Sequence, residues 1–297
     1  MIEQADSNGM LYPVRGNISE VISHYYHIYH HGTGKIIKHL SPSLEIMMIF
    51  NFGTPVLISF NNDIPEEEVG RGCVVIGPLR KMLNYELSTG AEAIVVNFKL
   101  NGFYRLFKVP LNYLAGETLY DPDKLAGRYK FSTLWKQVSL ISDLQARIEM
   151  ISSYVLHFVE ENDVAVQPLL RGEHYFYESA LQPVKAIAAD SSLTQRTIQL
   201  RFRKYAGYSP KELIRFLRFK LVLDWLLTRD DQQVDIFEVI LAFGYHDQSH
   251  LIKDFKYFLG TTPQPFLTQL KGKEFFVTGH GPKYKDSFPE DHKNPQK

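Results

Sequence analysis

Cysteine is almost absent from this chain: Cys73 is the one cysteine among 297 residues. A single cysteine cannot build the disulfide framework that stabilises many small secreted proteins. The sequence also lacks an apolar run near the roughly 18 residues of a membrane span, and it lacks a basic segment followed by an apolar core at its start. These absences predict a cytoplasmic protein stabilised by apolar packing, with Cys73 buried as a small apolar side chain in a strand.

Net charge is absent as well, because 33 Lys and Arg residues balance 33 Asp and Glu residues. A neutral chain is not expected to coat nucleic acid nonspecifically, although a local basic face is sufficient for a specific binder. The length leaves room for two domains, each large enough to bury a core of its own. An apolar content of 44% is ordinary for globular proteins.

Short strand-type runs separated by turn signals fill the chain from Ile18 to about Leu100. The runs are Val21–His30, Leu44–Asn51, Val56–Phe60, Cys73–Ile76, Met82–Leu87 and Ala93–Leu100. Many short strands at this spacing favour a sandwich or a jelly-roll barrel. We therefore predict an α+β chain that begins with a β-rich, cupin-like jelly-roll domain over residues 1–125. Met1–Asn17 is expected to be loose, and Glu66–Glu68 is expected to lie in a solvated turn.

A helical pattern follows over Leu134–Glu161, with apolar residues recurring every three or four positions. This stripe can either pack against the barrel or form a dimer interface, and the sequence leaves both open. We assign residues 126–165 to a helical linker region, with Asn162–Gln167 as the linker itself. Residues 271–297 are rich in Lys, Gly, Pro and Asp, a composition typical of a disordered tail.

The segment Asp235–Phe266 has the pattern of a helix, a tight turn and a second helix. Gly244 interrupts the first periodic run where a helix would end, and Asp247 is a plausible N-cap for the second. From Gln248 the apolar positions recur at i, i+4 and i+7, and polar residues occupy the opposite face. The pattern fits either a pair of helices in an ordinary bundle or a helix-turn-helix unit that inserts into a DNA major groove.

A second copy of the pattern lies upstream, in Val184–Tyr205. Thr194 can cap its second helix. The run from Ser191 to Lys211 contains basic residues and no acidic ones, as expected for a surface that meets phosphates. Each copy is followed by a similar four-residue motif, Gly207–Pro210 in the first and Gly260–Pro263 in the second. In both motifs glycine ends a helix and proline begins the next one.

A strongly helical segment, Lys211–Leu227, joins the two copies. A helix of roughly 17 residues is about 25 Å long. A rod of that length can hold two recognition helices about one turn of DNA apart, roughly 34 Å. The paired units therefore predict an all-α domain that contacts double-stranded DNA twice.

Residues 166–270 resemble the DNA-binding domain of AraC/XylS-type transcriptional regulators. The resemblance rests on the I-A pair at Ile187 and Ala188, the run L-T-Q-R-T-I-Q-x-R-F at Leu193–Phe202, the run G-Y-S-P-K-E at Gly207–Glu212, Arg218, the run G-Y-H-D-Q-S-H-L-I-K-D-F-K at Gly244–Lys256, and G-T-T-P at Gly260–Pro263. The match covers about a third of the chain, and its second half is long and ordered. It implies a regulator without enzymatic activity.

The resemblance also implies which side chains contact DNA. They are Gln195, Arg196, Gln199, Leu200 and Arg203 in the first unit, and Gln248, Ser249, His250 and Lys253 in the second. Leu200 departs from the family, which usually has arginine at this position. Leucine cannot make a bidentate contact to guanine, but it can contact a thymine methyl group. The usual base preference of the family is therefore not expected here.

A weaker resemblance covers Phe98–Ala115, where G-x-x-x-L-F-x-V-P-L matches a segment in the N-terminal domains of a subgroup of these regulators. It supports a sensor or dimerisation role for the β-rich domain. We expect a homodimer that binds DNA, with a small-molecule effector and RNA polymerase as further partners. The sequence leaves open a purely structural N-terminal domain that binds no ligand. It also leaves open activation and repression, of which activation is the working expectation. No cofactor is expected.

The histidines His24, His27, His30 and His31 motivate the alternative, a cupin-type metal enzyme with an appended helical domain. Metal binding in a barrel needs ligands that converge from different strands. All four histidines lie in one segment, and in a strand His24 and His30 point to one face while His27 and His31 point to the other. We therefore predict no metal site, and the sequence contains no readable set of catalytic residues.

Overall fold

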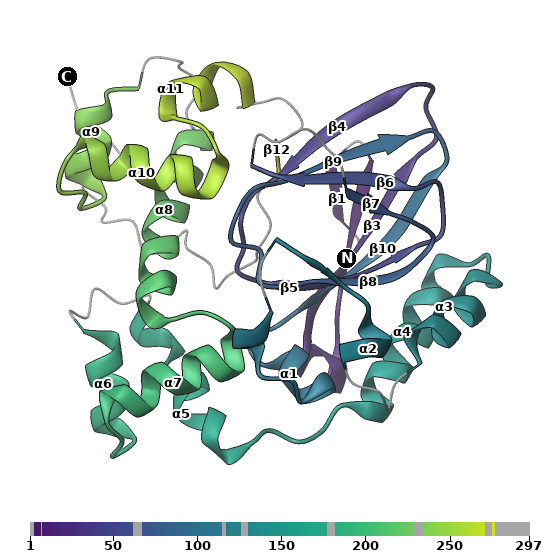
Figure 1. The fold of residues 1–297 in the computed structure, drawn as a ribbon, viewed down its shortest axis with the longest axis horizontal. Helices are drawn as coiled ribbons and strands as arrows, with labels where there is room; N and C mark the ends of the chain where they lie inside the picture. The colour runs from purple at the N-terminus through teal and green to yellow at the C-terminus, as the bar shows by residue number, and fades with distance from the viewer. Residues whose placement is uncertain are drawn as a thin grey trace.

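A β-rich region and a helical region lie side by side in the computed structural model (Figure 1). The N-terminal half forms the sheets, and the chain then continues through helices that include two helix-turn-helix units. This confirms the predicted α+β order of a β-rich region followed by an all-α one. The structure describes residues 3–6, 8–61, 67–114, 117–125, 130–176, 182–228, 234–270 and 275–276.

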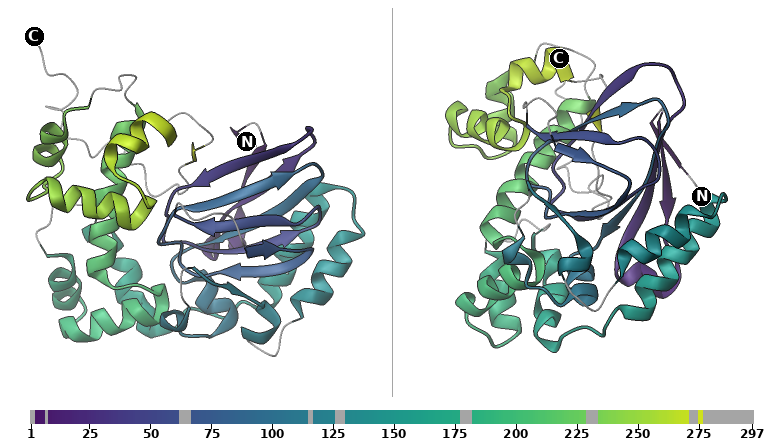
Figure 2. Two further views of the ribbon diagram at one scale, coloured as in Figure 1. Left: turned by 45° about the horizontal axis from the view of Figure 1, so that its top comes forward. Right: turned by 45° about the vertical axis from the view of Figure 1, so that its right-hand side comes forward.

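Two sheets, almost entirely antiparallel, face each other in the β-rich region. The first has the order β1 (Glu3–Asp6), β2 (Gly9–Pro13), β3 (Ile22–His30), β10 (Ala91–Phe98), β5 (Ile46–Asn51), β8 (Gly72–Ile76) and β11 (Leu119–Tyr120). The second has the order β12 (Phe275–Phe276), β4 (Lys35–Leu40), β9 (Leu83–Ser88), β6 (Val56–Phe60) and β7 (Glu67–Val69). The views in Figure 2 show the sheets curving around a common interior. A narrower assignment to the cupin type stays a prediction.

Register places one face of the first sheet toward that interior. In the central strand β10, Val95 pairs with Tyr26 of β3, and Asn97 pairs with His24. Because side chains alternate along a strand, Tyr26 and His24 face the same way as Val95 and Asn97. This alternation selects the residues that line the space between the sheets.

Three segments expected to lack regular structure contribute strands to the two sheets. Met1–Asn17 is not loose throughout, because β1 and β2 form a hairpin that extends the first sheet through β3. Glu67 and Glu68 form part of strand β7 rather than a turn, while Glu66 lies outside the described residues. The tail is not entirely disordered, because Phe275 and Phe276 form β12, which pairs in parallel with β4. The other tail residues, 271–274 and 277–297, lie outside the described residues.

The segment expected to form one helix over Leu134–Glu161 forms two. The helix α3 (Phe131–Ser139) ends before Ile141, and α4 (Leu144–Phe158) begins after Asp143, whose carboxylate accepts the amide hydrogen of Ala146. Three short helices precede or accompany them: the 3-10 turn η1 (Gly16–Glu20), α1 (Gly102–Phe107) and α2 (Pro122–Leu125). The 3-10 turn η2 (Leu111–Tyr113) follows α1.

Helix α4 packs on the outer face of the first sheet (Figure 1). The Tyr25 hydroxyl lies 2.7 Å from Ser152 Oγ, and Arg147 donates to Glu92 Oε1 at 2.7 Å. Of the two uses left open for this apolar stripe, packing against the β region is the one observed in the chain. A dimer contact through α4 stays a prediction.

The helical region starts with the 3-10 turn η3 (Val164–Val166), α5 (Gln167–Arg171) and the 3-10 turn η4 (Glu173–Phe176). The first helix-turn-helix unit consists of α6 (Pro183–Asp190) and α7 (Gln195–Ala206). The long helix α8 (Pro210–Thr228) leads to the second unit, α9 (Ile236–Ala242) and α10 (Gln248–Leu259). The chain then passes through α11 (Pro263–Pro265) and the π-helix η5 (Phe266–Leu270).

The length of the chain allows one separate core for each of two domains, but the buried apolar residues do not divide in this way. One cluster runs from the first sheet through Phe107 and Phe131 into both helix-turn-helix units, where it includes Phe202 and Phe255. A separate cluster lies between the two sheets. The helical region is therefore packed against the β region rather than tethered to it. No helix of the described residues is long and apolar enough to cross a membrane.

Candidate nucleic-acid interface

The first unit presents an exposed polar face on α7. Thr194 accepts the amide hydrogen of Thr197 at 3.1 Å and so caps the helix, which ends at Gly207 in the left-handed conformation. Ile198 and Phe202 are buried against the unit's core. All five predicted contact residues on this helix are exposed: Gln195, Arg196, Gln199, Leu200 and Arg203.

The second unit repeats this construction on α10. Asp247 accepts the amide hydrogen of His250 at 2.8 Å, and this bond lowers the pKa of the Asp247 carboxyl. Leu251 and Phe255 are buried, and the helix ends at Gly260 in the left-handed conformation. The four predicted contact residues of this unit are exposed too: Gln248, Ser249, His250 and Lys253. The structure thus brings the nine residues together as two sets on separate helices, joined by α8.

A buried carboxylate holds α10 on α8. Asp254 is 4% exposed and receives Arg215 Nε at 2.6 Å, Arg218 at 3.5 Å and the Tyr245 hydroxyl at 3.0 Å. Burial, together with the Asp254 charge, raises the pKa of Tyr245. Because a buried charge needs partners, this network fixes α10 relative to α8 and orients its exposed face.

Residues 187–269 match a family model described as a helix-turn-helix domain. The matched span begins at Ile187, in the middle of α6, and extends past α11, so it includes both capped recognition helices. Residues 187–269 therefore form a helix-turn-helix domain, as the paired units in the sequence predict.

Other comparisons add little to this assignment. The sequence matches no curated protein significantly. One structure of ToxT from Vibrio cholerae has 11% sequence identity to the chain and a TM-score of 0.39; the alignment covers 82% of this chain and 96% of ToxT. A second ToxT structure has 14% identity and a TM-score of 0.38, with 80% of this chain and 98% of ToxT covered. The AraC-like transcriptional activator CuxR has 12% sequence identity and a TM-score of 0.23; the alignment covers 72% of this chain and 80% of CuxR. Scores this low do not establish a shared overall arrangement.

The basic residues of the run from Ser191 to Lys211 have two different environments. Arg196 and Arg203 are exposed on α7, as expected for a phosphate-facing surface. Arg201 instead donates to the Ala165 carbonyl at 3.0 Å, and Lys204 lies over the rings of Tyr104 and Tyr205. The interpretation of the whole run as an electrostatic footprint is therefore wrong for Arg201 and Lys204, which stabilise contacts within the protein.

Two lysines beside α7 were missed in the sequence. An open pocket of about 510 Å³ lies between α6, α7 and the start of α8, and Lys185 and Lys211 line it together with Gln199 and Arg203. Both lysines are exposed, and the lining contains no acidic residue. The available signal was their position in the first turn of a helix that flanks a recognition helix.

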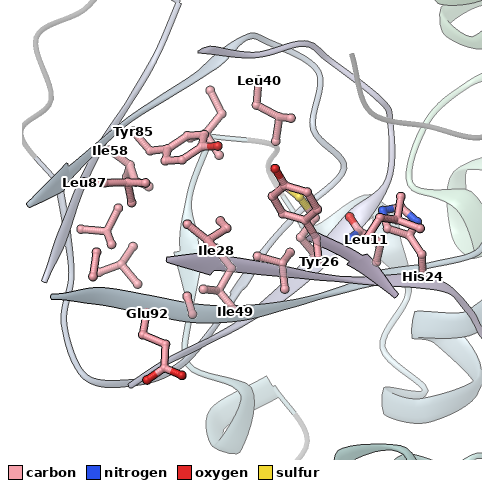
Figure 3. Close-up of a pocket in the computed structure, with 18 of the residues that line it drawn as sticks. Leu11, His24, Tyr26, Ile28, Leu40, Ile49, Ile58, Tyr85, Leu87 and Glu92 are labelled. Atoms are coloured by element: carbon pink, nitrogen blue, oxygen red, sulfur yellow. The ribbon is translucent and has the colours of Figure 1, made fainter. Parts of the chain in front are cut away.

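A second candidate site lies between the two sheets. It is a cavity of about 450 Å³ with a mostly apolar wall. Tyr26 and Tyr85 point into it, whereas the carboxylate of Glu92 turns away, as Figure 3 shows. The helix-turn-helix domain contributes to the wall through Leu227 at the end of α8, and β12 contributes Phe275.

One polar atom in the cavity wall has no hydrogen-bond partner. Asn97 is 2% exposed, and its Oδ1 makes no hydrogen bond. His24, its cross-strand neighbour, lines the same end of the cavity. An unpaired buried acceptor is costly, so a ligand that donates a hydrogen bond here would gain affinity by satisfying it.

The histidines do not form a metal site among the described residues. His24 lines the cavity, His30 contacts Asn8 and the Gly34 carbonyl, and His31 is exposed. His27 lies 3.6 Å from Glu92, and His27 and Arg147 together lower the pKa of that carboxyl. In the described part of the chain, no three His, Cys, Asp or Glu side chains are grouped to hold a metal ion.

Proposed function

We propose that this chain is a transcription regulator of the AraC type that reads DNA with α7 and α10 in successive major grooves on one face of the duplex. The observation that carries the proposal is that all nine predicted contact residues are exposed on two capped helices with buried opposite faces. The connecting helix α8 has 19 residues, which corresponds to about 28 Å. That length is compatible with two recognition helices about 34 Å apart, the spacing of one DNA turn.

The roles of the contact residues follow from their chemistry. Arg196 and Gln199 have the hydrogen-bonding groups that read guanine and adenine in the major groove, and Leu200, at 49% exposure, offers an apolar contact for a thymine methyl. Lys253 and Arg203 can contact bases or phosphates. Lys185 and Lys211 flank α7 and are assigned to phosphates, which position the helix without selecting a sequence.

Binding-site selection from a random DNA pool, using the full chain at moderate salt with nonspecific competitor, tests this function. Enrichment of a site with two short blocks about one turn apart is expected. Enrichment of a single block would mean that only one recognition helix reads bases, and recovery of no sequence would count against specific binding. A repeat of the two-block site would indicate the expected homodimer. Contact with RNA polymerase and activation of transcription stay predictions.

The cavity between the sheets is the proposed effector site. Its volume lies in the range of small-molecule pockets, and its wall favours an apolar molecule. The free Asn97 Oδ1 favours a ligand that carries one hydrogen-bond donor, such as a hydroxyl group, at the end that lies near His24. Leu227 and Phe275 would let such a ligand contact parts of the chain that belong to or follow the AraC-type domain.

A thermal-shift screen with paired compounds tests the effector site. Each pair consists of an apolar alcohol and the hydrocarbon of the same shape. Binding to the native protein raises the melting temperature. We expect the alcohols to stabilise the wild type more than the hydrocarbons do, and we expect Asn97→Leu to remove that difference. A panel in which no apolar compound produces a shift would count against a ligand in this cavity.

A further inference from the structure

The loop between β8 and β9, residues 77–82, touches the C-terminal ends of both recognition helices. It connects the two sheets, because β8 belongs to the first and β9 to the second. Helix ends expose carbonyl groups that have no partner within the helix, and they carry the negative end of the helix dipole. The loop supplies hydrogen-bond donors to one such carbonyl at the end of α7 and another at the end of α10.

At α7, the guanidinium of Arg80 donates to the carbonyl of Gly207, the residue that ends the helix. The Nε of Arg80 also lies 3.4 Å from Glu212 Oε1 in the first turn of α8. Arg80 therefore ties the loop to the junction of α7 and α8. Its positive charge at a helix C-terminus is favourable, and a charge-assisted hydrogen bond is stronger than a neutral one.

At α10, the backbone amide of Met82 donates to the carbonyl of Phe258 at 2.7 Å. Met82 is fully buried, and Phe258 packs against Phe216 and Phe219 of α8. The second recognition helix is thus joined to the loop by a backbone bond that is shielded from water. This bond does not depend on the identity of a side chain.

The β-region side of the loop is also fixed by backbone bonds. The Leu79 amide donates to the Glu45 carbonyl at 2.9 Å, and the Leu79 carbonyl accepts from the amides of Ser43 and Leu44. The Met82 carbonyl accepts from Asn61 at 2.7 Å. Immediately after Met82 comes β9, whose residues Leu83 and Tyr85 line the cavity. A displacement of β9 would therefore be transmitted to both helix ends.

We propose that the 77–82 loop sets the position of α7 relative to α10, and that the β-rich region uses this loop to control which spacing of two DNA blocks the protein binds. The inference rests on the proposed function for its consequence in DNA reading. Its structural half stands independently, because the contacts at Gly207 and Phe258 exist in the protein without DNA. The competing account is that α8 alone fixes the distance between the units.

Distances between spin labels in the full chain, without DNA, test the structural half. Labels are attached to Ala189→Cys on α6 and Leu241→Cys on α9, two exposed positions outside the predicted contacts, in a Cys73→Ala background. We expect a narrow distance distribution for the otherwise unchanged protein and a broadened or shifted one for Arg80→Ala. The matched control is Lys81→Ala, which removes the same charge from the same loop but pairs with Glu117 at 3.2 Å rather than with the helices.

An unchanged distribution in Arg80→Ala would overturn the proposal and favour α8 as the sole spacer. Equal broadening in Arg80→Ala and Lys81→Ala would also overturn it, since the effect would then not depend on the contact with Gly207. Arg80→Lys, which keeps the charge and one donor, should restore part of the narrow distribution and guards against a folding defect in the alanine variant.

The effect of the loop on DNA spacing is tested by measuring affinity for the site that the wild type selects and for versions of it with one base pair added or removed between the two blocks. We expect the wild type to prefer its selected spacing about tenfold or more, and Arg80→Ala to lose most of that preference, while Lys81→Ala keeps it. Retention of the full preference by Arg80→Ala would overturn this half. Failure to select any two-block site would instead contradict the proposed function, and the label distances would still decide the role of the loop.

Discussion

Pro78 packs directly against Gly207, the residue that ends the first recognition helix. Its Cγ lies 2.8 Å from the position that a Cβ on Gly207 would occupy, and the Cβ of Leu111 lies 3.2 Å from the same position. Gly207 also has a φ of +82°, a backbone conformation that favours glycine. Two separate constraints therefore require glycine here: the helix end needs the left-handed conformation, and the β region approaches too closely for a side chain.

Substitution at two glycines separates these constraints. Gly244 has a φ of +64° but no atom within 4 Å of an added Cβ, so Gly244→Ala should cost only the conformational strain, about 1–2 kcal/mol. Gly207→Ala adds the clash with Pro78, and we expect it to cost about 1–3 kcal/mol more. Denaturant unfolding of the two variants measures the difference. Pro78→Ala should recover part of the loss in Gly207→Ala and none in Gly244→Ala; equal losses at the two glycines would contradict the close approach.

Glu45 is predicted to make stability depend on pH. Burial raises the pKa of its carboxyl to about 7, although the positive charge of Lys220 opposes the shift, and its Oε2 is buried without a hydrogen bond. An acid whose pKa is higher in the folded state binds more protons there than in the unfolded state. The free energy of unfolding therefore falls as pH rises from about 4.5 to about 7 and then levels off.

Glu45→Gln removes this titration and should stabilise the protein above pH 7, by at most about 3 kcal/mol. The gain should shrink steadily as pH falls and vanish well below pH 4.5, where Glu45 is protonated in both states. Unfolding by urea at several pH values, with Glu149→Gln on the exposed face of α4 as the matched control, checks the trend. A gain that does not vary with pH would show that the carboxyl is not the responsible group.

Local chemistry explains which parts of this structure the sequence could predict. Thr194 and Asp247 cap the two recognition helices through bonds to residues three positions away, and Gly207 and Gly260 end them, so each boundary is encoded within a few residues. The contact roles of the nine residues are implied by the family resemblance, and their exposure agrees with helical periodicity within these boundaries. The break between α3 and α4 was also encoded locally, by Asp143, but the continuing apolar pattern on both sides concealed it.

Contacts between distant segments could not be predicted in the same way. Arg196 and Arg201 lie on the same helix and have the same chemistry, and only the position of the Ala165 carbonyl turns one of them inward. The parallel pairing of β12 with β4 joins residues more than 200 positions apart, so no local pattern indicates it. The 77–82 loop contains turn residues typical of any hairpin, and its contacts with both recognition helices depend on how the two regions pack.

The buried network around Asp254 should determine the stability of the second unit. Asp254→Ala leaves two guanidinium groups and the Tyr245 hydroxyl without their shared partner, and we expect a loss of about 3–5 kcal/mol. Lys124→Ala removes an exposed ion pair with Asp121 and should change stability by less than about 1 kcal/mol. Denaturant unfolding measures both variants. A loss in Asp254→Ala no larger than that of the control would mean that the network adds no net stability.

Arg196 and Lys185 lie on neighbouring helices of the first unit, and both are exposed cations, yet they are assigned different roles. Arg196→Ala should weaken binding to the selected site by about 1–3 kcal/mol and relax the preference at one base pair, because a base contact is lost. Lys185→Ala should weaken binding to all sequences alike and reduce the salt dependence by about one counterion. Affinities for the selected site, for its single-base variants and for unrelated DNA, each at several salt concentrations, separate the two patterns. If Arg196→Ala followed the pattern expected for Lys185→Ala, Arg196 would be a phosphate contact, and base reading by α7 would then depend on Gln199 and Leu200.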